Sequence, residues 1–207
     1  GGLDPTYIIG GLLNSSGSHA RLGSGKYIVA EADESDASFL HLYPIIAVIT
    51  NIDADHLDTY AGDFVNLRNN FVEFLHQIPF YGLAVLCIDD EGVKKILSEV
   101  TKPVVTYGVD IEADYRAELL YQEKTKTWFN VSRTDKKDWL EVELNLPGKH
   151  NLLNALASIA VAHELGVSDK NIINALRHFQ GISRRCHVYG KIKINNFNVI
   201  LIDDYAH

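Results

Sequence analysis

The chain has 207 residues, of which 46% are apolar and 22% charged, a balance typical of a globular protein with one domain and a piece of another. It carries 27 acidic and 19 basic residues, and its formal net charge is −8. The acidic excess lies within residues 27–67, where no lysine or arginine occurs. Because phosphate backbones are bound by clustered Lys and Arg, this window argues against nucleic acid as a partner and favours a cation.

Three further features limit the class of protein. No apolar run approaches the ~18 residues of a membrane span and no signal peptide opens the chain, so we expect no membrane partner and a cytoplasmic location. Cys87 and Cys186 are far apart and outside any C-x-x-C pattern, which favours two reduced structural cysteines. The sequence contains no Met, even at position 1, and we expect it to be a piece of a longer chain.

The first half of the chain alternates strand and helix patterns. Because their apolar residues are consecutive, the strands are expected to be covered on both faces of a mainly parallel α/β sheet. Phe64 to Ile78 has the three- and four-residue spacing of an amphipathic helix, and 91–100 predicts a crossover helix. The predicted strands are 7–9, 27–30, 45–49, 83–88 and 104–106.

The second half has a different pattern. Between residues 110 and 147 the apolar residues alternate, which predicts antiparallel hairpin strands appended to the sheet. Helices are predicted from His150 to Leu165, closed by Gly166, and from an N-cap at Ser168 to near Phe179. Two last strands, 188–194 and 197–202, would form a hairpin too small to be stable alone, so we assign them to a following domain.

Two acidic stretches directly follow predicted strands, Ala30 to Asp36 and Thr50 to Asp58. Ligands of open α/β sheets bind beyond the carboxyl ends of the strands, and carboxylate oxygens suit magnesium, so these stretches together predict a shared metal and phosphate site. His56 could ligate the metal through a neutral ring nitrogen. The alternative is a solvated loop in which Asp58 or Thr59 caps the next helix and His56 is only hydrogen-bonded.

Two later stretches are less specific. Gly148 to Asn154 begins a helix whose asparagines could read a purine edge, although Asn at a helix start is also a routine cap. Arg184 and Arg185 could bind phosphate, although adjacent arginines are usually surface residues. No G-x-x-x-x-G-K-[ST] phosphate loop occurs in the sequence.

Taken together and in this order, these stretches resemble the Mur ligases of bacterial cell-wall synthesis. The resemblance covers essentially the whole chain. It is carried by Gly2-Leu3-Asp4-Pro5-Thr6, His19-Ala20-Arg21-Leu22-Gly23, Glu31 to Leu42, Thr50-Asn51-Ile52, Asp55 to Tyr60, Phe74-Leu75-His76, Pro79-Phe80-Tyr81-Gly82, Pro147 to Asn151 with Asn154-Ala155, and Asp203 to His207.

The resemblance implies the fold and the reaction. It implies a P-loop NTPase-like central ATPase domain over 1–183, without its phosphate loop, and the first strands of a C-terminal domain over 184–207. The reaction would be ATP- and Mg2+-dependent amide formation in the bacterial cytoplasm. The branch most similar joins L-alanine to UDP-N-acetylmuramate through an acyl phosphate.

The same resemblance implies roles for individual residues. Glu31 and His56 would be magnesium ligands at the γ-phosphate, with Glu34 as the alternative to Glu31. Arg185 would contact a phosphate, and Asp204 the ribose or an interdomain surface. The residues implied to face the adenine are His150, Asn151 and Asn154.

The sequence departs from the family pattern at two places. Cys186 follows Arg185 where the family usually has an aromatic residue, and Asn69, Asn70 and Phe71 occupy the region where several siblings carry a carbamylated lysine. Two other hypotheses stay open, namely the recycling ligase that attaches a tripeptide to UDP-N-acetylmuramate, and a folded module without catalysis. Because the phosphate loop is missing, we expect the 207-residue chain alone to be inactive.

Overall fold

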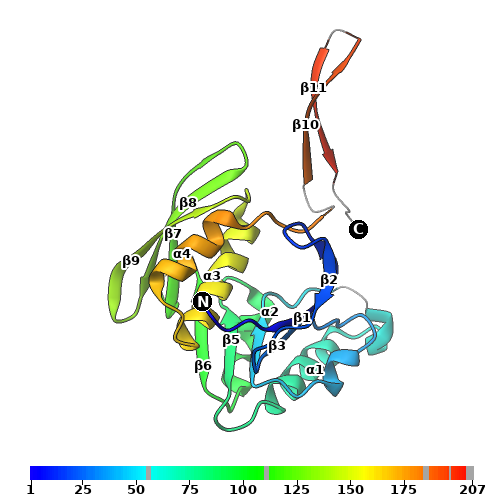
Figure 1. The fold of residues 1–207 in the computed structure, drawn as a ribbon. Helices are drawn as coiled ribbons and strands as arrows, with labels where there is room; N and C mark the ends of the chain where they lie inside the picture. Colours follow the sequence, from blue (N-terminus) through cyan, green and yellow to red (C-terminus); the bar gives the residue numbers. More distant parts are fainter. Residues whose placement is uncertain (55–56, 110–111, 184–186, 196, 204–207) are drawn as a thin grey trace. The chain divides into compact units, whose positions relative to one another are not determined.

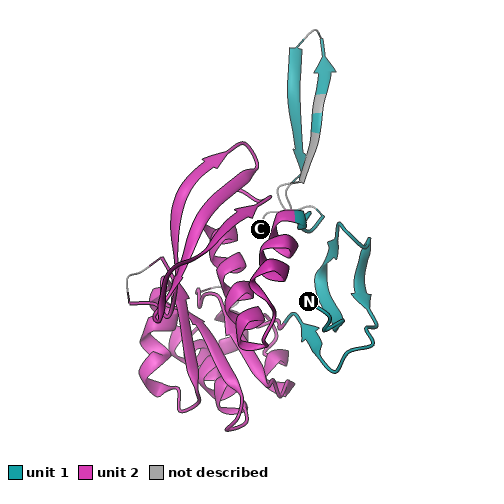
Figure 2. Cartoon of the chain, turned by 60° about the vertical axis from the view of Figure 1, so that its left-hand side comes forward, with its two compact units in different colours: residues 1–31, 178–207 teal, residues 32–177 magenta. Residues whose placement is uncertain are grey.

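The computed structural model describes residues 1–54, 57–109, 112–183, 187–195 and 197–203. The chain divides into two compact units, which Figure 2 colours separately. Unit 1 comprises residues 1–31 and 178–207, and unit 2 comprises residues 32–177. His56, Arg185 and Asp204, all predicted site residues, lie outside the described residues.

Unit 2 contains a six-stranded sheet in the order β4-β5-β6-β7-β8-β9. Figure 1 labels its strands β5 to β9. The pairs from β4 to β7 are parallel, and the pairs from β7 to β9 are antiparallel. The predicted α/β architecture with appended hairpin strands is therefore confirmed. The strands are β4 (Ile46–Ile49), β5 (Leu83–Cys87), β6 (Val104–Gly108), β7 (Tyr115–Glu123), β8 (Lys126–Arg133) and β9 (Lys136–Leu144).

Helices cover both faces of this sheet. This explains why the apolar residues of β5 are consecutive. Ala84 and Leu86 are buried in one core, with residues of α1 and α2. Val85 and Cys87 are buried in the other, with residues of α3 and α4, because successive side chains of a strand point to opposite faces. The helices of unit 2 are α1 (Phe64–His76), α2 (Glu91–Ile96), α3 (Lys149–Glu164) and α4 (Asp169–His178), with the 3₁₀-helices η1 (Ser38–His41), η2 (Leu57–Tyr60) and η3 (Leu97–Glu99).

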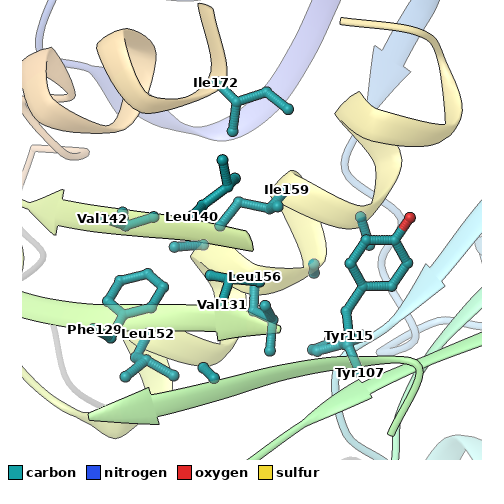
Figure 3. Packing of buried hydrophobic residues seen from close by; sticks show 14 of the residues in the cluster. Tyr107, Tyr115, Phe129, Val131, Leu140, Val142, Leu152, Leu156, Ile159 and Ile172 are labelled. Carbon is teal, nitrogen blue, oxygen red and sulfur yellow. The ribbon is translucent and has the colours of Figure 1, made fainter. Parts of the chain in front are cut away.

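The larger core lies between the antiparallel strands and the helices α3 and α4. Figure 3 shows strand residues such as Phe129 and Leu140 facing Leu156 and Ile159 of α3, with Ile172 contributed by α4. Each fully buried aliphatic or aromatic side chain of this kind contributes about 1.5–3 kcal/mol through removal of apolar surface from water. This packing holds α3 across the sheet, and so determines where the two ends of α3 lie.

Unit 1 contains two small sheets. The first has the order β2-β1-β3, in which β1 (Thr6–Leu13) is antiparallel to β2 (Ser18–Arg21) and parallel to β3 (Ile28–Ala30). The second is the antiparallel hairpin of β10 (His187–Ile194) and β11 (Phe197–Asp203). The hairpin at the end of the chain was predicted, whereas β2 was not, because its polar, four-residue sequence lacks an apolar run.

Two expectations about β3 and α1 are wrong. Ile28 and Val29 of β3 are 70% and 53% exposed, so this strand is not covered on both faces, and the described residues of unit 1 include only the last residue of a helix. The N-cap of α1 is Asp63, whose side chain accepts the Val65 N–H at 2.8 Å, and not Asp58 or Thr59.

Within the described part of the chain, no helix has the length and apolar character needed to cross a membrane.

Candidate functional site

A cavity of about 150 Å³ lies at the carboxyl end of β4, one of the parallel strands of unit 2. Thr50, Asn51 and Asp53 follow β4 directly, and Glu34 reaches the same cavity from the acidic stretch. Phe39, Phe71 and Phe74 form its apolar floor, with ring centroids of Phe39 and each partner 5.2 Å apart. The cavity is therefore lined by residues of both predicted acidic stretches. Their oxygen atoms lie around an apolar floor made by the three phenylalanine rings.

The acidic stretch is a loop with a defined shape. The carboxylate of Asp33 accepts the Ser35 N–H at 2.8 Å, and that of Asp36 accepts the Ser38 N–H at 2.9 Å. Hydrogen bonds from Ser38 lower the pKa of Asp36 below its usual value, because they stabilise the charged form. The loop is therefore a turn-rich segment that η1 follows at Ser38.

Glu31 and Glu34 have different surroundings. The carboxylate of Glu31 accepts the Gly10 N–H at 2.6 Å within unit 1, and its side chain is exposed. Glu34 belongs to unit 2 and lines the cavity described above. Both glutamates are near a strand end, as the sequence predicts, but the choice between them as metal ligand stays a prediction.

The end of β5 contributes two aspartates that the sequence reasoning missed. Asp90 accepts N–H bonds from Val93 at 2.8 Å and Ile52 at 3.2 Å, so it caps α2 and also ties down the segment after β4. Asp89 accepts the Val109 N–H at 2.8 Å. The rule that located the other acidic stretches, carboxylates directly after an apolar strand, would have found this pair as well.

Asp89 also connects the end of β5 to the start of α3. Its Oδ2 lies 2.8 Å from Nζ of Lys149, and its side chain is only 8% exposed. A side chain at position 108 would place its Cβ 2.3 Å from Oδ1 of Asp89, so Gly108 allows this close approach. The first residue of α3 is thereby linked to the carboxyl ends of β5 and β6.

The start of α3 presents the side chains predicted to face adenine. His150 and Asn154 are exposed and four residues apart, and therefore lie on one face of the helix. Nδ2 of Asn151 donates to the Pro147 carbonyl at 2.7 Å, so this amide is engaged in the first turn. The Gly148 N–H donates to Oε1 of Gln122 at 3.0 Å, which joins the helix start to β7.

Magnesium suits the oxygen atoms of the polar residues that line this cavity. Carboxylate, hydroxyl and amide oxygens are the hard ligands it prefers, usually together with substrate phosphates and not in a cage made wholly of protein. The described residues contain no group of three His, Cys, Asp or Glu side chains close enough to hold a metal alone. Asp55 and His56 lie outside the described residues.

Comparison with known proteins gives the family. Residues 13–162 match the Mur ligase middle domain. This chain belongs to the Mur ligase family, because the match covers more than half of its length.

Solved structures agree with this assignment. The UDP-N-acetylmuramate-alanine ligase of Thermotoga maritima is 30% identical with a TM-score of 0.82, over 99% of this chain and 45% of that one. The UDP-N-acetylmuramate:L-alanyl-gamma-D-glutamyl-meso-diaminopimelate ligase of Neisseria meningitides is 29% identical with a TM-score of 0.76, over 88% of this chain and 60% of that one. The MurF ligase of Thermotoga maritima in complex with ADP shares the fold, with 20% identity and a TM-score of 0.74, over 98% of this chain and 47% of that one. The chain thus spans about half the length of these ligases.

Proposed function

We propose that this chain is the nucleotide-binding part of an ATP-dependent ligase that forms an amide bond on UDP-N-acetylmuramate in the bacterial cytoplasm. The observation that carries the proposal is the cavity at the end of the parallel strand β4, lined by Glu34, Thr50, Asn51 and Asp53, in a chain of the Mur ligase family. Phosphoryl transfer depends on positioning and on neutralising spread negative charge, and a rim of oxygen donors suits a metal that does so.

In this proposal Glu31 and His56 hold magnesium, with Glu34 as the alternative to Glu31. When bound, the metal would neutralise charge on the transferred phosphoryl group. His150, Asn151 and Asn154 would face the adenine from the start of α3. Arg185 would contact a phosphate, and Asp204 the ribose or a neighbouring domain.

The proposed reaction has two steps. The muramate carboxylate takes the γ-phosphoryl group of ATP, which releases ADP and leaves an acyl phosphate. The amine of the incoming substrate then attacks the acyl carbon, and phosphate leaves. We propose L-alanine as this amine, supported by 30% identity to the L-alanine enzyme of Thermotoga maritima.

A tripeptide is the second candidate for the amine. The ligase of Neisseria meningitides whose name includes L-alanyl-gamma-D-glutamyl-meso-diaminopimelate is 29% identical, and a murein peptide ligase of Psychrobacter arcticus is 30% identical over the whole chain. Identity alone therefore does not separate the two amines.

The test uses the intact ligase that contains this chain. ADP release is followed with UDP-N-acetylmuramate and either L-alanine or the tripeptide. Release only with L-alanine supports the first candidate, and release only with the tripeptide supports the second. No release with either would refute the ligase assignment and leave a folded module without catalysis.

We further propose that residues 184–207 belong to a following domain. β10 and β11 pair only with each other among the described residues. Apolar side chains of β11 such as Phe197, Ile200 and Ile202 are exposed, and an isolated two-stranded hairpin is marginal in water. Limited proteolysis of the intact ligase should cut near residue 184 before it cuts within β10 or β11.

A further inference from the structure

Two neighbouring side chains of η2 attach the acidic loop, residues 33–36, to the segment that follows β4. The hydroxyl of Tyr60 donates to the carbonyl oxygen of Glu34. Oγ1 of Thr59 donates to the carbonyl oxygen of Ser35 at 2.5 Å. Because adjacent donors bind adjacent carbonyls, the loop is held at two points and cannot rotate about either bond alone.

The Tyr60 side chain is itself firmly held. It is 3% exposed and is buried in the core that contains Phe39, Leu67 and Phe71. Nδ2 of Asn66 donates to the Tyr60 carbonyl at 3.2 Å, which fixes the backbone of η2 from α1. A buried ring in a close-packed core has one rotamer available, so the position of its hydroxyl is defined.

The loop's other hydrogen bonds have a different effect. Asp33 binds the Ser35 N–H, Asp36 binds the Ser38 N–H, and the Ala37 N–H donates to the Glu34 carbonyl at 3.1 Å. These bonds join residues two or three positions apart, so they determine the shape of the loop. The bonds from Thr59 and Tyr60 span more than twenty residues and determine where the loop lies in unit 2.

We propose that Tyr60 and Thr59 are positioning residues that hold the acidic loop so that its carboxylates meet the metal and nucleotide at the rim of the cavity. This role rests on the function proposed above. Glu34 lines the cavity and its backbone carbonyl accepts the bond from Tyr60, and Glu31 lies three residues before the attached carbonyl in the sequence. Residues that orient metal ligands through hydrogen bonds typically change metal affinity or activity by about 10–100-fold when replaced.

The test compares Tyr60→Phe, which keeps the ring and removes the donor, with Tyr115→Phe as a matched control. Tyr115 is also a buried tyrosine, and its hydroxyl donates to Glu164 at 2.8 Å near the other end of α3. Thr59→Val removes the second donor. The first readout is hydrogen exchange of the Ser35, Ala37 and Ser38 amides in the 207-residue chain. The second is the affinity of the intact ligase for Mg2+–ADP, measured by calorimetry.

We expect Tyr60→Phe to speed exchange of these three amides by roughly 2- to 10-fold, the equivalent of one hydrogen bond. It should weaken Mg2+–ADP binding by about tenfold or more, with Thr59→Val in the same direction and Tyr115→Phe without effect on either readout. A purely structural role would lower stability equally in both tyrosine variants and would leave the affinity unchanged.

The outcomes separate this role from the proposed function. If the wild-type ligase binds Mg2+–ADP and the Tyr60→Phe variant binds it equally well, the positioning role is refuted and the proposed function stands. If the wild-type ligase binds no Mg2+–ADP, both are refuted, even where exchange at residues 35–38 is faster. Unchanged exchange in Tyr60→Phe and Thr59→Val would refute the attachment itself.

Discussion

The two ends of α3 carry polar clusters of opposite character. Near its C-terminal end, Tyr115, Arg133, His163 and Glu164 line a hollow of about 310 Å³ and bind one another. Near its start, Lys149 pairs with Asp89, and the acidic side chains of Glu34 and Asp53 line the cavity at the end of β4. The groups of the first cluster form a continuous hydrogen-bonded network, whereas the acids of the second region are lining residues of a cavity. Charge and polarity alone therefore do not identify a binding site, and the hydrogen bonds among the groups have to be considered as well.

The C-terminal cluster shows how this satisfaction is achieved. Arg133 donates to Nε2 of His163, and Nδ1 of His163 lies 2.6 Å from the Tyr115 hydroxyl, which donates to Glu164. The guanidinium also binds both carboxylate oxygens of Asp135, at 2.9 and 2.6 Å. Because Nε2 accepts from Arg133, Nδ1 must carry the proton in the neutral ring. This continuous chain of donors and acceptors joins β7, β8 and α3, and its role is structural.

The largest expected effect comes from breaking the structural cluster at Trp139. This side chain is 8% exposed, lies beneath the Arg133 guanidinium, and donates to Asp169 at 3.0 Å. Trp139→Ala should lower the free energy of unfolding by about 3–5 kcal/mol, measured by urea denaturation. Below its melting temperature the intact ligase should keep its Mg2+–ADP affinity. A loss of affinity in the folded variant would contradict the separation of the two clusters.

The next largest effect is expected at the two residues proposed to hold magnesium. If Glu31 and His56 hold the metal as proposed, Glu31→Ala or His56→Ala in the intact ligase should lower turnover by more than about 100-fold, because direct metal ligands matter more than the groups that orient them. Glu31 is exposed, so thermal unfolding of its variant should be nearly unchanged. If Glu31→Ala kept full turnover while Glu34→Ala lost it, Glu34 would replace Glu31 as the metal ligand.

A smaller effect should follow from removing the Asp90 carboxylate, which holds the segment after β4. Asp90→Ala removes the cap of α2 and the bond to the Ile52 N–H, and should cost about 0.5–2 kcal/mol of stability. Asp63→Ala is the matched control, because Asp63 caps α1. Both variants should lose similar stability in denaturant melts. Only Asp90→Ala should weaken Mg2+–ADP binding, and equal weakening by both would mean that the Ile52 bond has no role in the site.

The smallest effect concerns Asp135 of the C-terminal cluster and Asp36 of the acidic loop. Arg133 lowers the pKa of Asp135 below the usual 3.8, and Ser38 lowers that of Asp36. Each aspartate therefore stabilises the fold above pH 3.8, and this contribution is lost as the pH falls through its lowered pKa. In an NMR titration, 1 M salt should reduce the shift of Asp135, because an exposed ion pair is screened, and leave that of Asp36 nearly unchanged. Equal salt responses would show that both shifts have the same cause.

Local patterns in the sequence were sufficient to predict most helices and strands. The apolar spacing of α1, the consecutive apolar residues of β5 and the glycine that ends α3 can each be recognised within a short stretch of sequence, because helix faces and buried strands require particular neighbours in sequence. The cap of α1 was misplaced, since Asp58, Thr59 and Asp63 are all good capping residues and only Asp63 reaches Val65. Choosing among equal local candidates requires the three-dimensional path of the chain.

The sequence by itself determined the class of this protein, its two acidic stretches and the family to which it belongs. Only the tertiary structure decided that β1 and β3 pair in a sheet separate from β4, and that the second acid stretch is attached to the first through Thr59 and Tyr60. It also revealed the pairing of Lys149 with Asp89. The reason is physical: strand pairing and hydrogen bonds across twenty or more residues depend on packing between distant segments, and a local pattern contains no information on which of them meet.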